Sequence, residues 1–152
     1  MSHILIVDDD EIIAQLASEA LMDAGHACGW VIDGEKALEL LRWRRPDLLL
    51  LDQDMPGLSG TQVLRSLRGS AENYDLPVIM FTGITGLEDE NTAYFNGAQA
   101  YLRKPFETDT LLRTVEEILT ARSDKPRHRS LVEHLEFAAG RWRDAPARRA
   151  VS

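Results

Sequence analysis

The sequence predicts an α/β fold, a doubly wound sheet of five parallel strands with helices on both faces and a short C-terminal helical tail. The strongest sign is the run Leu48–Leu51, because four consecutive leucines are typical of a strand buried on both faces of a parallel sheet. Further apolar runs at 4–7, 78–81 and 100–102 end in polar residues and lie far enough apart for crossover helices. Strand and helix patterns alternate five times, as such a fold requires.

Apolar periodicity and helix-breaking residues set the order of the elements. Gly25 and Gly97 are expected to end helices, and Asp10 is expected to cap the first helix. Gly29 lies within the second strand and makes it the weakest of the five. The predicted elements are, in order, a strand at about 3–7, a helix over 10–24, a strand over 26–32, a helix over 35–44, a strand from about 47, a helix around 63–67, a strand at 78–81, a short acidic helix over 88–96, a strand at about 99–102 and a helix around 111–119.

The chain is predicted to divide into a main domain at 1–122 and a polar linker with a short helical tail at 123–152. A tail helix over about 129–143 is favoured because four apolar residues recur at helical spacing. These are Leu131, Leu135, Ala138 and Trp142. A helix this short does not bury a core alone. It is therefore expected to dock on the main domain, pair with another chain or remain frayed, and we favour a homodimer.

Charge is distributed unevenly along the chain. Residues 1–120 carry 9 Lys and Arg against 21 Asp and Glu, whereas residues 121–152 carry 8 against 4. An acidic main domain argues against nonspecific DNA binding. The basic tail has the charge to touch nucleic acid, but a solvated terminal segment is the favoured interpretation.

Composition also limits the class of protein. Of the 152 residues, 44% are hydrophobic, but no apolar run approaches the roughly 20 residues needed to cross a bilayer. The start Met1-Ser2-His3 leads into the first strand without the features of a secretory signal. The single cysteine, Cys28, forms no intramolecular disulfide, so we expect a cytoplasmic protein.

Polar side chains follow four of the predicted strands at the point where each strand ends. An acid triplet at 8–10 follows the first strand, Asp52 ends the third, and Thr82 and Lys104 follow the fourth and fifth. Ligands of open α/β sheets collect at the carboxyl ends of the strands. Asp52 is therefore poised to bind a cation or to act as a nucleophile. Carboxylates gathered there repel unless a cation lies between them, and oxygen ligands favour Mg²⁺ or Mn²⁺.

In this order, the motifs resemble the receiver domain of two-component response regulators over residues 3 to about 121. The shared features are the acid pair Asp8-Asp9, a run from Asp52 through Met55-Pro56 to Gly60, Thr82, and the run Lys104-Pro105-Phe106. Each feature alone is weak, but all four in order with crossover-sized gaps are highly specific. The resemblance implies the five-unit, flavodoxin-like arrangement of strands and helices.

The resemblance also assigns a phosphoacceptor and a metal site. It implies that Asp52 accepts the phosphoryl group. Asp9 and Asp52 would bind Mg²⁺ (or Mn²⁺) directly, together with the backbone carbonyl of Asp54, and Asp8 would act through water. Asp10 falls outside this set, because it is expected to be a helix cap.

Other residues are assigned supporting roles by the same resemblance. Lys104 would pair first with Asp52 and then with the phosphoryl oxygens, and it would be followed by a cis peptide bond. Thr82 would donate its hydroxyl to the phosphoryl group, vacating space that the switch residue Tyr101 enters. Asp54 and Ile84 stand where members of the family tune the loss of the phosphoryl group.

We therefore expect a single-domain response regulator that takes a phosphoryl group from a histidine kinase or a histidine phosphotransfer protein. Its output is expected through the face made by helix 4, strand 5 and helix 5, toward a downstream protein and not toward DNA or a membrane. It would catalyse its own phosphorylation and hydrolysis, but it is not expected to be an enzyme acting on metabolites.

Two alternatives remain. Asp52-Gln53-Asp54 after an apolar strand also resembles the Asp-x-Asp motif of haloacid-dehalogenase-like phosphatases, although in that family the acid pair comes last and not first. The other alternative is a receiver-like binding module that no longer relies on phosphorylation. The intact set of five polar residues argues against that module.

Overall fold

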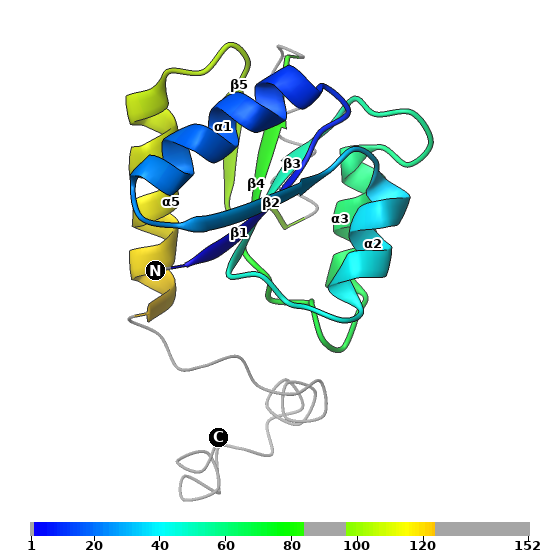
Figure 1. The fold of residues 1–152 in the computed structure, drawn as a ribbon. Helices are drawn as coiled ribbons and strands as arrows, with labels where there is room; N and C mark the ends of the chain where they lie inside the picture. Colours follow the sequence, from blue (N-terminus) through cyan, green and yellow to red (C-terminus); the bar gives the residue numbers. More distant parts are fainter. Residues whose placement is uncertain (1, 84–96, 124–152) are drawn as a thin grey trace, which may run out of the picture.

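The computed structural model describes residues 2–83 and 97–123 of the chain (Figure 1). In this part of the chain, the strands and helices are β1 (His3–Val7), α1 (Glu11–Asp23), β2 (Ala27–Val31), α2 (Gly34–Leu41), β3 (Leu48–Asp52), α3 (Gly60–Arg68), β4 (Val78–Thr82), β5 (Ala100–Arg103) and α5 (Thr108–Ser123). Strands and helices alternate from β1 to β4, as predicted, and β5 is followed by α5. The predicted helices over 88–96 and 129–143 lie outside the described residues, as does most of the predicted tail segment.

The five strands form one parallel sheet in the order β2-β1-β3-β4-β5, which confirms the predicted doubly wound fold. The chain first moves outward from β1 to β2 and then crosses back to place β3 on the other side of β1. Ligands of open α/β sheets bind where the strand order reverses in this way. In the register of this pair, Val7 lies opposite Leu51, so Asp8 and Asp52 follow side by side.

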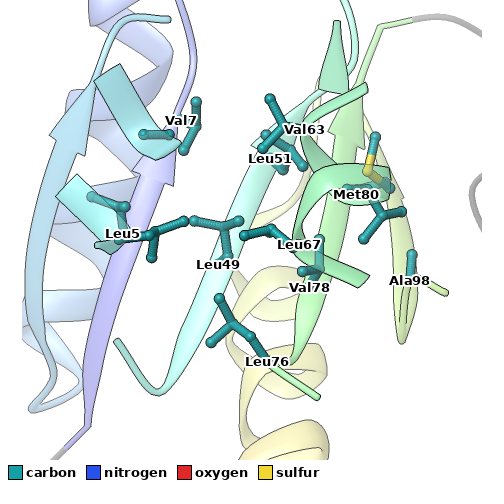
Figure 2. Close-up of a cluster of buried hydrophobic side chains, with 13 residues drawn as sticks. Leu5, Val7, Leu49, Leu51, Val63, Leu67, Leu76, Val78, Met80 and Ala98 are labelled. Carbon is teal, nitrogen blue, oxygen red and sulfur yellow. The ribbon is translucent and has the colours of Figure 1, made fainter. Parts of the chain in front are cut away.

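The central strand β3 anchors the hydrophobic core on both sides of the sheet. Its four leucines are fully buried. Leu49 and Leu51 belong to the cluster beneath α2 and α3 (Figure 2), whereas Leu48 and Leu50 belong to the cluster beneath α1 and α5. Each buried leucine contributes roughly 1.5–3 kcal/mol. The strand that ends in Asp52 is therefore held firmly along its whole length.

The first helix begins and ends where the sequence predicts. The side chain of Asp10 accepts hydrogen bonds from the backbone N–H groups of Ile12 (3.0 Å) and Ile13 (3.3 Å), so it is the N-cap of α1. Gly25 follows the helix with a φ of 97°, a left-handed conformation that favours glycine. Asp10 is thereby committed to the helix, unlike the two acids before it.

The end of α2 differs from the prediction, and β2 is more regular than the glycine within it suggests. The second helix ends at Leu41 and not at residue 44, because the N–H of Trp43 bonds the carbonyl of Leu40 in a tighter turn. Trp43 is 81% exposed, so no burial supports a further helical turn. Gly29 does not break β2, since this strand pairs with β1 along its whole length.

The third helix starts directly against the end of β3. Ser59 and Gln62 cap its first turn reciprocally, with the Ser59 N–H 2.8 Å from Gln62 Oε1. A Cβ atom on Gly60 would lie 2.4 Å from the carbonyl oxygen of Asp52 and 2.9 Å from Cε of Met80. Only glycine allows the helix to approach the strand this closely, so Gly60 helps to set the position of the Asp52 backbone.

We expect Gly60→Ala to lower the free energy of unfolding by about 1–3 kcal/mol, because the added methyl group forces α3 away from β3. Gly69→Ala is the matched control, since its Cβ would meet nothing closer than 3.6 Å and its φ is −89°. Urea denaturation of both variants checks this expectation. Equal stabilities of the two variants would show that the approach of α3 to Asp52 is not tight.

Candidate functional site

Three carboxylates meet at the carboxyl ends of β1 and β3. Asp8, Asp9 and Asp52 each offer an oxygen atom, and these atoms lie within 4.8 Å of one another. Asp8 and Asp52 are buried, whereas Asp9 is exposed. In the part of the chain that the structure describes, this is the one group of acidic, His or Cys side chains that comes together in this way. The parallel pairing of β1 with β3 is what unites residues 44 positions apart in the sequence.

The three consecutive acids at 8–10 have different roles: Asp8 and Asp9 belong to the carboxylate cluster, and Asp10 caps α1. Asp8 is held by its backbone N–H, which donates to the carbonyl of Val31 (3.1 Å), and its Oδ1 accepts from the N–H of Asp10 (2.9 Å). Its other oxygen, Oδ2, faces the site. Asp10 turns toward α1 as the cap, which leaves Asp9 as the exposed member of the carboxylate cluster.

Lys104 brings the positive charge of the site from the end of β5. Its Nζ lies 2.6 Å from Oδ2 of Asp8 and 3.4 Å from Oδ1 of Asp52. The resemblance implied a pairing with Asp52, and the structure places the ammonium between both acids, closer to Asp8. The peptide bond between Lys104 and Pro105 is cis, as the resemblance implied.

An aromatic ring that the sequence analysis did not single out contacts the lysine. Nζ of Lys104 lies 5.0 Å from the ring centroid of Phe81, within the range of a cation–π contact. Phe106 packs on Phe81 with ring centroids 5.0 Å apart. The ammonium therefore contacts two acids and one aromatic ring. The signal was present in the apolar strand that ends in Phe81 and in the run Lys104-Pro105-Phe106, but apolar strand residues are ordinarily core.

Gln53 is a second residue that the sequence analysis missed. Its Oε1 accepts hydrogen bonds from both the N–H and the hydroxyl of Thr61, each at 2.8 Å. Its carbonyl accepts from the N–H of Gly60 at 3.0 Å. The loop after β3 is thereby closed onto α3 immediately beside Asp52. No spacing rule marks a glutamine for such a role.

The electrostatics of the site are those of crowded, desolvated acids. Burial, and then the charge of Asp8, raise the pKa of Asp52 to about 7, against the opposing effect of Lys104. Burial alone would lower the pKa of Lys104, but its hydrogen bond to Asp8 and the charge of Asp52 raise it above the ordinary value. The lysine therefore stays charged, whereas the ionised form of Asp52 is disfavoured relative to a carboxylate in water.

The other predicted site residues are placed less completely. Thr82 ends β4, opposite Arg103 of β5, and only its backbone is described. Tyr101 lies opposite Met80 and packs, half-buried, against the α2–α3 side of the core. Asp54 is exposed in the loop after β3, and Ile84 lies outside the described residues. The structure therefore leaves the predicted coupling of Thr82 to Tyr101 as a prediction.

The donor set fits a small divalent cation. All three side chains offer oxygen, which Mg²⁺ and Mn²⁺ prefer, and Asp9 keeps the cluster open to solvent for water ligands. Burial and the charge of Asp8 keep the pKa of Asp52 raised despite the opposing effect of Lys104. A cation held by these oxygens would favour the charged form of Asp52.

In metal-free protein, the charge on Asp52 is expected to cost stability as the pH rises. Folding raises its pKa from the ordinary value of 3.8 to about 7, so between these values the folded chain holds a proton that the unfolded chain has released. The free energy of unfolding should therefore fall from pH 4 to pH 7, by on the order of 1–3 kcal/mol. Asp52→Asn should remove most of this slope in urea denaturation with EDTA present.

Saturating Mg²⁺ should have the same effect on the wild type, since a cation favours the ionised carboxylate. Asp47→Asn is a suitable control, because this acid lies at the opposite end of β3 and bonds the backbone of His3. A slope that persists in Asp52→Asn would assign the titration to another group.

The chain is similar in sequence to known signalling proteins. The family model of the response regulator receiver domain matches residues 4–116. The chain is 36% identical over 119 residues to the DNA-binding dual master transcriptional regulator RpaA of Synechocystis sp., covering 78% of this chain and 49% of RpaA. It is 33% identical over 135 residues to the DNA-binding response regulator MtrA of Mycobacterium tuberculosis, covering 89% of this chain and 58% of MtrA. The chain thus spans about half the length of these curated relatives.

Solved structures agree with the sequence relatives. The chemotaxis protein CheY4 of Vibrio cholerae superposes with a TM-score of 0.74 at 32% identity, covering 78% of this chain and 98% of CheY4. A CheY-like receiver domain protein of Methanospirillum hungatei superposes with a TM-score of 0.78 at 27% identity, covering 83% and 99% of the two chains. No helix in the described part of the chain is long and apolar enough to cross a membrane. The chain belongs to the two-component response regulators, and the domain that holds the acid cluster is their receiver domain.

Proposed function

We propose that this receiver domain accepts a phosphoryl group on Asp52 from a phosphohistidine donor. The observation that supports this most directly is the meeting of Asp8, Asp9 and Asp52 within 4.8 Å, with Nζ of Lys104 at 3.4 Å from Asp52. In the transfer, a carboxylate oxygen of Asp52 forms a P–O bond while the P–N bond to the histidine breaks. The leaving imidazole nitrogen takes up a proton. The donor would be a histidine kinase or a histidine phosphotransfer protein.

The carboxylate cluster is proposed to hold Mg²⁺ or Mn²⁺. Asp9 and Asp52 would bind directly, together with the backbone carbonyl of Asp54, and the buried Asp8 would act through water. Bound there, the cation would supply positive charge against the phosphoryl oxygens, which is what phosphoryl transfer mainly requires. The exposure of Asp9 supports its direct role, because a ligand at the rim leaves room for water.

Lys104 and Thr82 are proposed to recognise the phosphoryl group. The ammonium of Lys104 already lies between Asp8 and Asp52, and its flexible stem allows it to follow charge from the carboxylate to a phosphoryl oxygen. Thr82 stands at the end of the neighbouring strand β4, at the same edge of the sheet as Asp52, and a threonine there can supply a hydroxyl donor. Both residues bind and orient, whereas Asp52 is the nucleophile.

The output is proposed to be a change in a protein-binding surface. Tyr101 lies on β5, next to the strand that ends in Thr82, which supports its role as the switch residue. The surface would involve β5 and α5 together with the predicted helix over 88–96, and a downstream protein would read it. Asp54 and Ile84 are proposed to tune the lifetime of the phosphoryl group. A cytoplasmic location and the lack of DNA binding stay predictions of the sequence.

Acetyl phosphate with Mg²⁺ is expected to add one phosphoryl group to the wild-type chain, seen by intact mass. Asp52→Asn should reduce this uptake by at least about a hundredfold, because an amide is not a nucleophile here. Asp54→Asn is the matched control, since it removes a neighbouring acid from the same loop and should keep the uptake. Comparable uptake by Asp52→Asn would overturn the assignment.

A turnover assay on the same variants distinguishes the receiver from the phosphatase alternative. A haloacid-dehalogenase-like phosphatase would need Asp54 as its second catalytic acid and would turn over p-nitrophenyl phosphate continuously. We expect no multiple turnover of that substrate, and the initial rate of phosphoryl uptake should not depend on Asp54. Multiple turnover lost in Asp54→Asn would favour the phosphatase, and lack of any phosphoryl uptake would favour the phosphorylation-independent binding module.

Metal binding should distinguish two adjacent acids. Asp9→Asn is expected to weaken Mg²⁺ binding by at least about tenfold, since it removes a charged ligand. Asp10→Asn should have little effect, because Asp10 caps α1 and asparagine caps a helix equally well. Isothermal titration with Mg²⁺ measures both. Equal losses of Mg²⁺ affinity in the two variants would place Asp10 in the metal site and contradict its role as a helix cap alone.

A further inference from the structure

The outward side of α1 carries a line of exposed residues that the phosphoryl chemistry does not use. Its inward residues Ala14, Ala17, Ser18 and Leu21 are buried. The opposite side presents, at helical spacing, an outer ridge made by Ile12, Leu16, Glu19 and Asp23. Ile12 and Leu16 are 71% and 54% exposed. The ridge is therefore apolar toward the start of the helix and acidic toward its end.

The acidic half of the outer ridge is electrostatically unfavourable as it stands. The helix has no Lys or Arg, and carboxylates near a helix C-terminus face the negative end of the helix dipole. Glu19 accepts a hydrogen bond from Gln15 (3.2 Å), but neither Glu19 nor Asp23 forms an ion pair with another described residue. A cationic segment placed against these two acids would relieve both effects.

The chain leaves the receiver domain close to this acidic end. The helix α5 packs beside α1 (Figure 1), and Oε1 of Glu116 lies 2.8 Å from Nε2 of His26, just after α1. From Glu116 the helix continues for seven residues to Ser123, a rise of about 10 Å. The next five residues span up to about 17 Å when extended. The following segment can therefore reach Asp23.

The tail has the complementary order of charge and apolarity. Reading away from α5, Lys125, Arg127 and Arg129 come first, and the apolar residues Leu131, Leu135 and Trp142 follow. Glu133 and Glu136 lie among these apolar residues, but helical spacing turns both away from the apolar side. Run antiparallel to α1 as a helix, the tail would bring its basic start to Asp23. Its apolar part would then reach Leu16 and Ile12. The lengths agree, since 129–142 would span about 20 Å and 12–23 about 17 Å.

We propose that residues 125–142 dock along the outer ridge of α1 of the same chain, antiparallel to that helix. Docking within one chain is favoured because the short linker holds the tail at an effective concentration near millimolar. The overall charges agree with this contact, with residues 1–120 at a net −12 and residues 121–152 at +4. The proposal does not depend on phosphorylation of Asp52.

Disulfide trapping in the full chain tests the contact. In a Cys28→Ala background, Leu16→Cys is combined with Leu135→Cys, a pair brought together by the proposed register. Leu40→Cys with Leu135→Cys is the matched control, since Leu40 is also exposed (37%) but lies on α2, across the sheet. Leu16 (54% exposed) and Leu40 are both solvent-accessible in the receiver domain, so their cysteine variants should fold. We expect the Leu16 pair to form an intramolecular disulfide at least about tenfold faster under mild oxidation.

Equal rates for the two pairs would overturn the proposal, because the tail would then have no preferred site. Predominant intermolecular disulfides at low protein concentration would also overturn it, and would make a second copy the occupant of the ridge. Charge reversal gives an independent readout. Asp23→Lys should slow trapping of the Leu16 pair about threefold, and adding Arg127→Glu should restore it, because the register that pairs Leu16 with Leu135 brings Arg127 closest to Asp23. An unchanged rate in Asp23→Lys would reject the antiparallel register.

Discussion

The hydrogen-bonded pairing of β1 with β3 sets the distance between the acids on which the rest of the site depends. Val7 lies opposite Leu51 in this register, and the residues after them, Asp8 and Asp52, are both buried. Burial of Asp52, and then the charge of Asp8 beside it, disfavour the ionised form of Asp52 and raise its pKa to about 7. The fold thus holds a carboxylate at Asp52 whose ionised form is favoured by added positive charge.

The protein supplies one positive charge itself, and its position explains how the site remains open to a second. The ammonium of Lys104 lies 2.6 Å from Asp8 and 3.4 Å from Asp52, held on its other side by the ring of Phe81. It partly offsets both buried acids without enclosing Asp9, which stays at the solvent edge. This arrangement leaves the rim of the cluster available to a divalent cation and to the phosphoryl donor.

The loop after β3 and the first helix are shaped by close backbone packing as much as by charge. Gly60 lets α3 approach the carbonyl of Asp52, and Gln53 ties the loop to Thr61 through two hydrogen bonds. Both features position Asp52 through its backbone and that of the following loop. Asp10 instead caps α1, so its side chain stabilises the helix and does not join the carboxylate cluster.

Local pattern by itself determined the strands, both ends of α1 and the identity of the polar residues at the sheet edge. Four buried leucines before Asp52 and the cap at Asp10 needed no long-range information, because burial and capping act within a few residues. Only the tertiary structure decided that Lys104 lies closer to Asp8 than to Asp52, and that α2 ends at Leu41. These outcomes depend on distances across strands and on which turns find a surface to bury, and a periodic pattern contains neither quantity.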